Sequence, residues 1–110
     1  MRRPHSYSPV TLASLELLGL RIATARRERR WTVAELADRA GISPNTLRSA
    51  ERGAATVSAG VMLELATLLG VGVLAADVKD LDRLVANERA RLDFMPARVR
   101  EPSGGIDDDF

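Results

Sequence analysis

The chain has 110 residues with no cysteine, one histidine and a net charge of +1 at pH 7. This length fits one small domain with tails, and the missing cysteines exclude a disulfide scaffold, a thiol nucleophile and a cysteine-ligated metal site. With one histidine and no paired-carboxylate, glycine-rich phosphate-loop or Ser–His–Asp pattern, we expect no enzyme activity, no metal and no cofactor. No apolar run is long enough to cross a membrane, so we expect a cytoplasmic protein.

The composition favours an all-α fold, because aromatic residues make up only 4% of the chain while alanine and leucine are abundant. Charge is unevenly distributed. Residues 11–70 hold eight arginines against six acids, which is +2, whereas residues 94–110 hold two arginines against four acids, which is −2. This asymmetry suggests an anion-binding body with an acidic tail. An ordinary solvated surface explains this distribution of charge equally well.

In chain order, residues 1–10 contain two prolines and no periodicity, which predicts a disordered basic arm. Apolar residues then recur at spacings of three and four, which predicts a helix over about 12–29. Thr32 and Glu35 form a T-x-x-E capping box that begins a second helix, and Gly41 ends it.

Ser43 followed by Pro44 predicts the start of a third helix, which stops at Gly53. Ser58 and Gly70 delimit a fourth helix, so that residues 11–73 form one domain. A fifth helix is expected over 74–93, and residues 94–110 form a flexible acidic tail. The fifth helix carries a heptad-like apolar seam, which packs either on its own domain or on a second copy as a dimer contact. The seam consists of Leu74, Val78, Leu81, Val85 and Leu92, of which the first four are the candidate dimer contact.

The stretch TVAELADRAGISPNTLRSAERG, residues 32–53, carries the strongest functional signal. Two short helices are joined by a turn containing Gly41, and Ala37 is small where the helices cross. Apolar residues fill the angle between them, namely Ile42, Leu47 and Ala50. A helix-turn-helix needs these features to hold its second helix outward for the major groove of DNA. A generic pair of helices in a bundle is the alternative.

Over about Leu18 to Val71 the sequence resembles the Cro/C1-type (XRE-type) helix-turn-helix domain. The resemblance rests on the RIxxxR that ends at Arg26, the ELAxxAGIS block, the ExG that ends at Gly53 and the closing LxxLLGV. It implies a five-helix, lambda-repressor-like DNA-binding fold. It also implies a homodimer that binds double-stranded operator DNA through the major groove and represses transcription.

The resemblance assigns roles by position. Arg26 and Glu51 match a structural ion pair between the first and third helices. Positions on the outer face of the third helix match base-reading residues, namely Ser43, Pro44, Asn45, Thr46, Arg48 and Ser49. Asn45 suits adenine and Arg48 suits guanine or phosphate, and a solvated polar face is the alternative. The residues expected at DNA phosphates are Thr32, Arg27, Arg29, Arg30 and Arg52.

Two departures from the family pattern weaken the expected phosphate contacts. Val33 stands where many members have a phosphate-binding glutamine, and residues 54–56 lack the basic side chains common in that loop. Trp31 either flanks the DNA backbone or forms a partly buried lid over the first helix.

After Val71 the chain resembles the HipB-like antitoxin regulators, which pair with a HipA-like kinase toxin. The similarity lies in an extended fifth helix followed by MPARVREPSGGIDDDF. Sparse apolar residues in an acidic segment suit folding on a protein partner, and a solubilising disordered end is the alternative. These residues are Phe94, Val99, Ile106 and Phe110.

Three functions remain open from the sequence. The leading one is a repressor that acts as an antitoxin and autoregulates its operon with a toxin partner. The others are a stand-alone transcriptional regulator and an interaction module that does not bind DNA. Val33 and the uncharged loop favour the last slightly, and the cluster of arginines opposes it.

Overall fold

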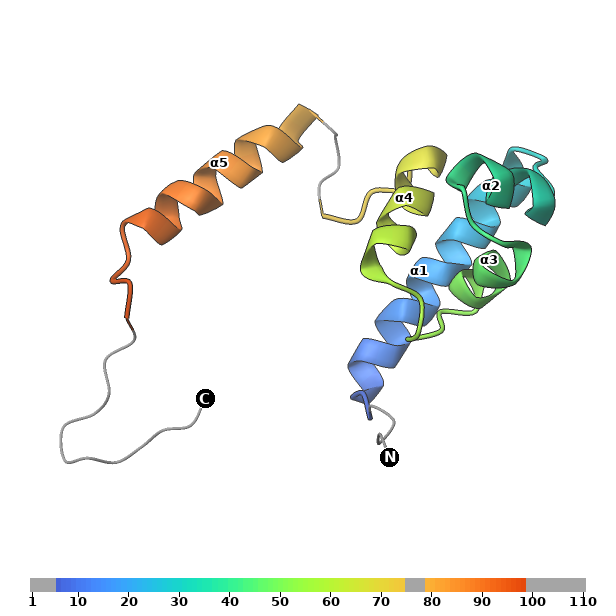
Figure 1. Cartoon of the computed structure of the whole chain (residues 1–110), viewed down its shortest axis with the longest axis horizontal. Coiled ribbons are helices and arrows are strands. Elements are labelled where there is room, and N and C mark those ends of the chain that lie inside the picture. The colour runs from blue at the N-terminus through green and yellow to red at the C-terminus, as the bar shows by residue number, and fades with distance from the viewer. Residues whose placement is uncertain (1–5, 75–78, 99–110) are drawn as a thin grey trace. The chain divides into compact units, whose positions relative to one another are not determined.

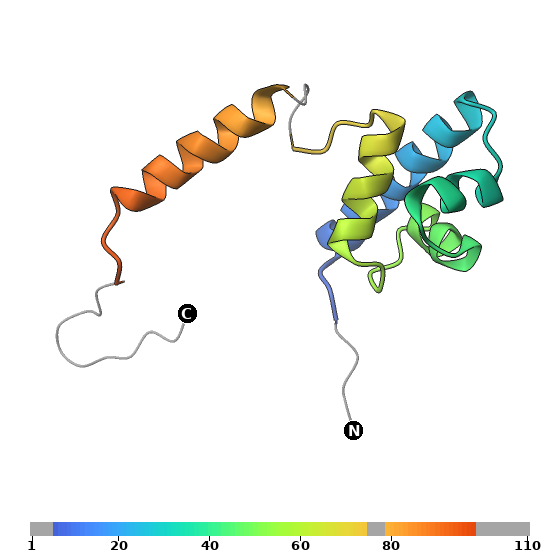
Figure 2. The ribbon, with the colours of Figure 1, turned by 45° about the horizontal axis from the view of Figure 1, so that its top comes forward.

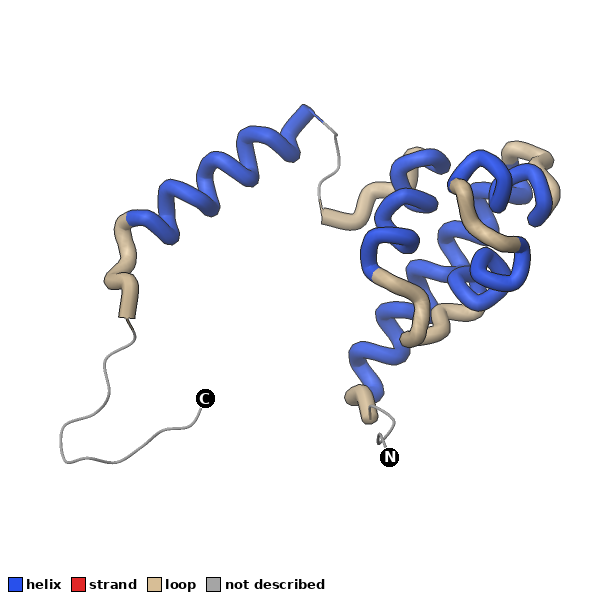
Figure 3. The backbone as a smooth tube through the Cα atoms, in the orientation of Figure 1, coloured by secondary structure: helices blue, strands red, loops and turns tan. Residues whose placement is uncertain are grey.

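The computed structural model describes residues 6–74 and 79–98, in which all regular structure is helical and no β-strand occurs (Figures 1 and 3). This confirms the all-α prediction. The helices are α1 (Pro9–Glu28), α2 (Val33–Ala40), α3 (Pro44–Glu51), α4 (Ala59–Leu69) and α5 (Lys79–Asp93). The chain divides into two compact units, Met1–Val73 and Leu74–Phe110. Among the described residues, no helix is both long and apolar enough to cross a membrane.

Helix α1 begins at Pro9, before the position near residue 12 that the sequence predicts. The side chain of Ser8 accepts a hydrogen bond from the backbone N–H of Thr11 at 3.3 Å, which caps the helix. Pro9 takes the first helical position, where proline loses no hydrogen bond. The predicted arm over 1–10 is therefore too long, because Pro9 and Val10 belong to the helix and Pro9 starts it.

The end of α1 is closed by a residue in the left-handed conformation. Arg30 has φ 59°, and the N–H of Trp31 donates to the carbonyl oxygen of Arg26 at 3.2 Å. Glycine is the usual residue in such a cap, because a side chain there approaches the following carbonyl. The sequence therefore gave no signal for this conformation.

Helices α2, α3 and α4 start and end where the sequence predicts, because their caps are local. Thr32 accepts from the N–H of Glu35 at 3.0 Å, and the Glu35 carboxylate accepts from the N–H of Thr32 at 2.9 Å. Gly41 and Gly70 end α2 and α4 with φ near 70°. The short link between α2 and α3 completes the helix-turn-helix (Figure 2).

One side chain from each of the first four helices is completely enclosed in the core. These are Ile22, Leu36, Leu47 and Leu65. Helix α1 also contacts α3 backbone to backbone, since a Cβ added at Gly19 would lie 2.6 Å from the carbonyl oxygens of Ala50 and Glu51. Within the first unit, α3 therefore packs against both α1 and α2.

Helix α5 begins later than expected. It starts at Lys79, while Leu74 lies in a bend before it and Val78 falls outside the described residues. Asp80 and Asp82 occupy its first turn, where negative charge suits the positive end of the helix dipole. The sequence predicts a start at Leu74 because the apolar spacing reaches back to that residue. Spacing alone, however, does not mark where a helix begins. No described residue of α5 is buried.

Candidate nucleic-acid interface

Helix α3 presents a polar face outward and an apolar face inward. Leu47 and Ala50 are buried, whereas Asn45 and Arg48 are exposed. The predicted base-reading residues therefore share one helix, with Ser43 and Pro44 exposed at its start. Thr46 and Ser49 are half-buried, at the margin of this face.

Asn45 and Arg48 are hydrogen-bonded to each other. Nη1 of Arg48 donates to Oδ1 of Asn45 at 3.2 Å, as residues three apart on a helix can do. This bond uses one of the five N–H donors of Arg48 and part of the acceptor capacity of Asn45. The remaining donors match the acceptors that purines present in the major groove.

The hydroxyl groups of α3 are engaged locally. Ser43 caps the helix by accepting from the N–H of Thr46 at 3.0 Å, and the two hydroxyl oxygens lie 2.9 Å apart. Oγ of Ser49 accepts from Nη2 of Arg52 at 3.2 Å. This bond holds Arg52 along the same edge of α3.

An open hollow of about 380 Å³ lies beside the exposed polar face of α3. Its walls include Asn45 and Ser49 from α3, and Thr56 and Ser58 from the loop and cap before α4. The sequence does not place Thr56 and Ser58 at the site, because it marks Ser58 only as a helix cap. The short loop after Gly53 is the one sign that the start of α4 lies near α3.

At the start of α2 the capping box uses the N–H groups of Thr32 and Glu35. A phosphate bound at this helix end would therefore meet the N–H groups of Val33 and Ala34 and the O–H of Thr32. The hydrogen bonds from the backbone and then the side chain of Thr32 lower the pKa of Glu35 below its ordinary value. Glu35 thus stays ionised next to the expected phosphate position, which opposes tight phosphate binding there.

The arginines predicted at phosphates have different surroundings. All four are exposed, but Arg29 is drawn toward Trp31, whose ring centroid lies 5.6 Å from its guanidinium carbon. Its Nη2 also lies near Gly70, at the C-terminal end of α4, where carbonyl groups attract cations. Arg27, Arg30 and Arg52 have no such contact with an aromatic ring among the described residues.

Trp31 is half-buried and packs on the core of the first unit. The guanidinium of Arg39 from α2 stacks over its ring at 4.3 Å from the centroid. This arrangement agrees with the partly buried lid over α1, one of the two alternatives for Trp31.

Arg26 and Glu51 form a two-point ion pair between α1 and α3. Nε of Arg26 lies 2.6 Å from Oε2 of Glu51, and Nη2 lies 3.1 Å from Oε1. The side chains are 10% and 13% exposed. The hydrogen bond to Glu51 raises the pKa of Arg26 against the opposing effect of burial. The pair joins the two helices through side chains that are largely buried.

The remaining predicted residues lie in the second unit. Leu81 and Val85 are exposed on α5, Leu74 is exposed before it, and Phe94 is 92% exposed after it. Val78, Val99, Ile106 and Phe110 fall outside the described residues.

The sequence profile of the helix-turn-helix domain family matches residues 17–84, which is more than half of the chain. The chain belongs to this XRE-like helix-turn-helix family, as the sequence predicts. No curated protein and no solved structure matches the chain. The domain indicates a DNA-binding regulator, and the matched residues include both α3 and the first turns of α5.

Proposed function

We propose that this protein is a sequence-specific transcriptional repressor that binds a near-palindromic operator as a homodimer, with α3 in the major groove. The observation that carries the proposal is the outward face of α3. There, Asn45 and Arg48 are exposed and positioned by each other, on a helix that Leu47 and Ala50 anchor in the core. In this role Asn45 reads adenine, Arg48 reads guanine, and Ser43, Pro44, Thr46 and Ser49 contact neighbouring base edges or phosphates.

Phosphate contacts supply the sequence-independent part of the affinity. We assign them to Thr32, Arg27, Arg30 and Arg52, and we rank Arg29 below these because Trp31 and the end of α4 already attract its guanidinium. Binding to operator DNA would place the working protein in the cytoplasm, at the chromosome.

We propose that the dimer joins two copies through the second unit, where the sequence predicts the contact at Leu74, Val78, Leu81 and Val85. Such a dimer presents two α3 helices one DNA turn apart, roughly 34 Å. Leu81→Asp places a charge in the contact, so it should yield monomers by light scattering. Persisting dimers would move the contact to the first unit, where Leu63 is exposed and Leu68 half-buried on α4.

We further propose that the regulator is an antitoxin whose partner is a HipA-like kinase toxin. Support comes from the similarity of the chain after Val71 to HipB-like regulators and from its apolar residues Phe94, Val99, Ile106 and Phe110. A chain ending at Asp93 should keep its dimer and its DNA binding but lose affinity for a co-encoded toxin. If the shortened chain neutralises that toxin equally well, the tail is only a solubilising end.

The experiment that tests the proposed function is a gel-shift titration of the full chain on its own upstream DNA, at a stated salt concentration. We expect a discrete complex with this DNA. Random DNA of equal length should compete only poorly for the protein. Equal competition by random DNA would contradict sequence-specific binding, and the lack of any complex would favour an interaction module. A discrete complex without any toxin-like neighbouring gene would favour a stand-alone regulator.

A further inference from the structure

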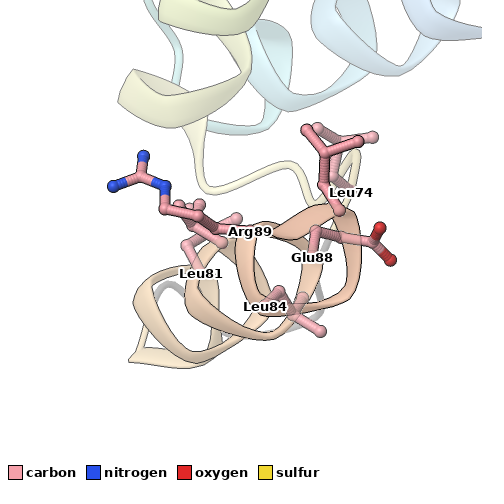
Figure 4. A pocket seen from close by; sticks show the side chains of 7 residues that line it. Leu74, Leu81, Leu84, Glu88 and Arg89 are labelled. Carbon is pink, nitrogen blue, oxygen red and sulfur yellow. The ribbon is translucent and has the colours of Figure 1, made fainter. Parts of the chain in front are cut away.

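Helix α5 carries an apolar face that the other described residues of the second unit leave uncovered. Leu81 is 39% exposed, Val85 53% and Leu92 68%, and together with Leu84 they line an open groove of about 530 Å³ (Figure 4). A helix of 15 residues is only marginally stable in water unless such a face is packed. The face is therefore expected to pack against another apolar surface.

The charges around this face are arranged so that the face is complementary to itself. Asp82 and Arg89 lie seven residues apart along one edge, which is two turns or about 10 Å. The ion pairs within α5 join Asp80 to Arg83 and Glu88 to Arg91, and neither pair involves Asp82 or Arg89. An edge with an acid near one end and a base near the other matches a copy of itself that runs in the opposite direction.

We propose that α5 pairs with α5 of a second copy in the antiparallel direction, with Asp82 of each helix meeting Arg89 of the other. This rests on the homodimer of the proposed function and defines its contact. In this register Leu81 packs against Leu92 of the second copy, and Val85 packs against Glu88. Asp82 of one helix and Arg89 of the other lie beside these two contacts. One such ion pair therefore forms at each end of the dimer. The seam thus runs from Leu81 to Leu92, further along α5 than the Leu74–Val85 contact that the sequence predicts.

The parallel alternative is disfavoured by Glu88, which lies in the middle of the apolar face between Leu81 and Leu92. Parallel helices in register would place the two Glu88 carboxylates directly opposite each other, where like charges repel. They would also separate Asp82 from Arg89. In the antiparallel dimer the two Glu88 side chains are offset along the axis, and each faces Val85.

The test is charge reversal in the full-length chain, read by sedimentation equilibrium. Asp82→Arg alone and Arg89→Asp alone should each weaken self-association about tenfold, because each replaces both attractive contacts by repulsive ones. An equimolar mixture of the two variants should recover wild-type affinity, since every contact in the mixed dimer is again attractive. Arg83→Asp, which reverses a charge on the outer face, should leave the association unchanged.

A monomeric wild-type chain would overturn the homodimer itself. A dimeric wild type whose mixed variants stay as weak as either variant alone would overturn only the antiparallel pairing. A second measurement leaves the charges intact: because the chain has no cysteine, Leu81→Cys mixed with Leu92→Cys should form a mixed disulfide on oxidation. Disulfides only between identical variants would show the parallel arrangement. The melting of the first unit, followed by Trp31 fluorescence, should be unchanged in every variant.

Discussion

Arg26 of α1 holds Glu51 of α3 by two hydrogen bonds, of 2.6 and 3.1 Å, and the same guanidinium donates to the carbonyl oxygen of Trp31 at 2.9 Å. One buried side chain thus joins α1, the end of α3 and the turn before α2. The orientation of α3 depends on this junction.

Glu51→Ala should lower the free energy of unfolding by about 3 kcal/mol, because it leaves the Arg26 cation nearly buried without its carboxylate. Urea titration followed by Trp31 fluorescence measures this loss. Glu64→Ala removes an exposed acid on α4 and serves as the control, with little change expected. A Glu51→Ala chain as stable as the control would contradict a structural role for the pair. Since the pKa of Arg26 is raised, its stabilising charge is lost only at strongly alkaline pH, so the loss should be the same at pH 6 and pH 9.

Gly19→Ala should destabilise the first unit by about 1–3 kcal/mol, because the new Cβ meets backbone oxygens of Ala50 and Glu51 that cannot rotate away. Gly60→Ala is the matched control. It also lies in a helix, but a Cβ there meets nothing within 4 Å, so the change should stabilise by about 0.5–1 kcal/mol. Thermal melts of both variants test the close contact of α1 with α3. Equal effects of the two changes would argue against that contact.

Arg30→Gly should stabilise the fold by about 1 kcal/mol, because glycine adopts the left-handed conformation without steric cost. If Arg30 contacts phosphate, the same change lowers affinity for operator and random DNA alike and reduces the salt slope by about one. The variant should therefore melt higher and bind more weakly. Higher melting with unchanged DNA affinity would remove Arg30 from the phosphate contacts.

Glu35→Gln tests the capping box through its pH dependence. The pKa of Glu35 is lowered by its hydrogen bonds to Thr32, so the stability it contributes is complete above its ordinary pKa of 4.5 and is lost as the pH falls through the lower folded value. Wild type should melt above the variant at pH 7, and the gap should narrow toward pH 3. A constant gap would mean that the charge of Glu35 does not stabilise α2.

The helix boundaries of α2, α3 and α4 could be predicted because their signals are local: Thr32 with Glu35, Ser43 with Pro44, and Gly70. The left-handed Arg30 could not be predicted, since the bonds that hold it come from the packed turn. The position of the Arg29 guanidinium likewise depends on packing, since its Nη2 lies near Gly70 at the end of α4, far away in the sequence.

The exposed face that Asn45 and Arg48 share on α3 could be predicted from the sequence, because residue spacing on a helix sets which side chains share a face. The bond between Asn45 and Arg48 and the neighbouring hollow did not follow. The hollow joins α3 to Thr56 and Ser58, and only the tertiary fold brings these together.

Base reading by α3 is tested by the affinity of each variant for operator and for random DNA, measured at one stated salt concentration. Asn45→Ala and Arg48→Ala should each weaken operator binding by about 1–3 kcal/mol and random DNA much less. Arg52→Ala, which removes a charge at the edge of α3, should weaken both DNAs equally. Equal losses on both DNAs for Asn45→Ala and Arg48→Ala would contradict base reading by this helix.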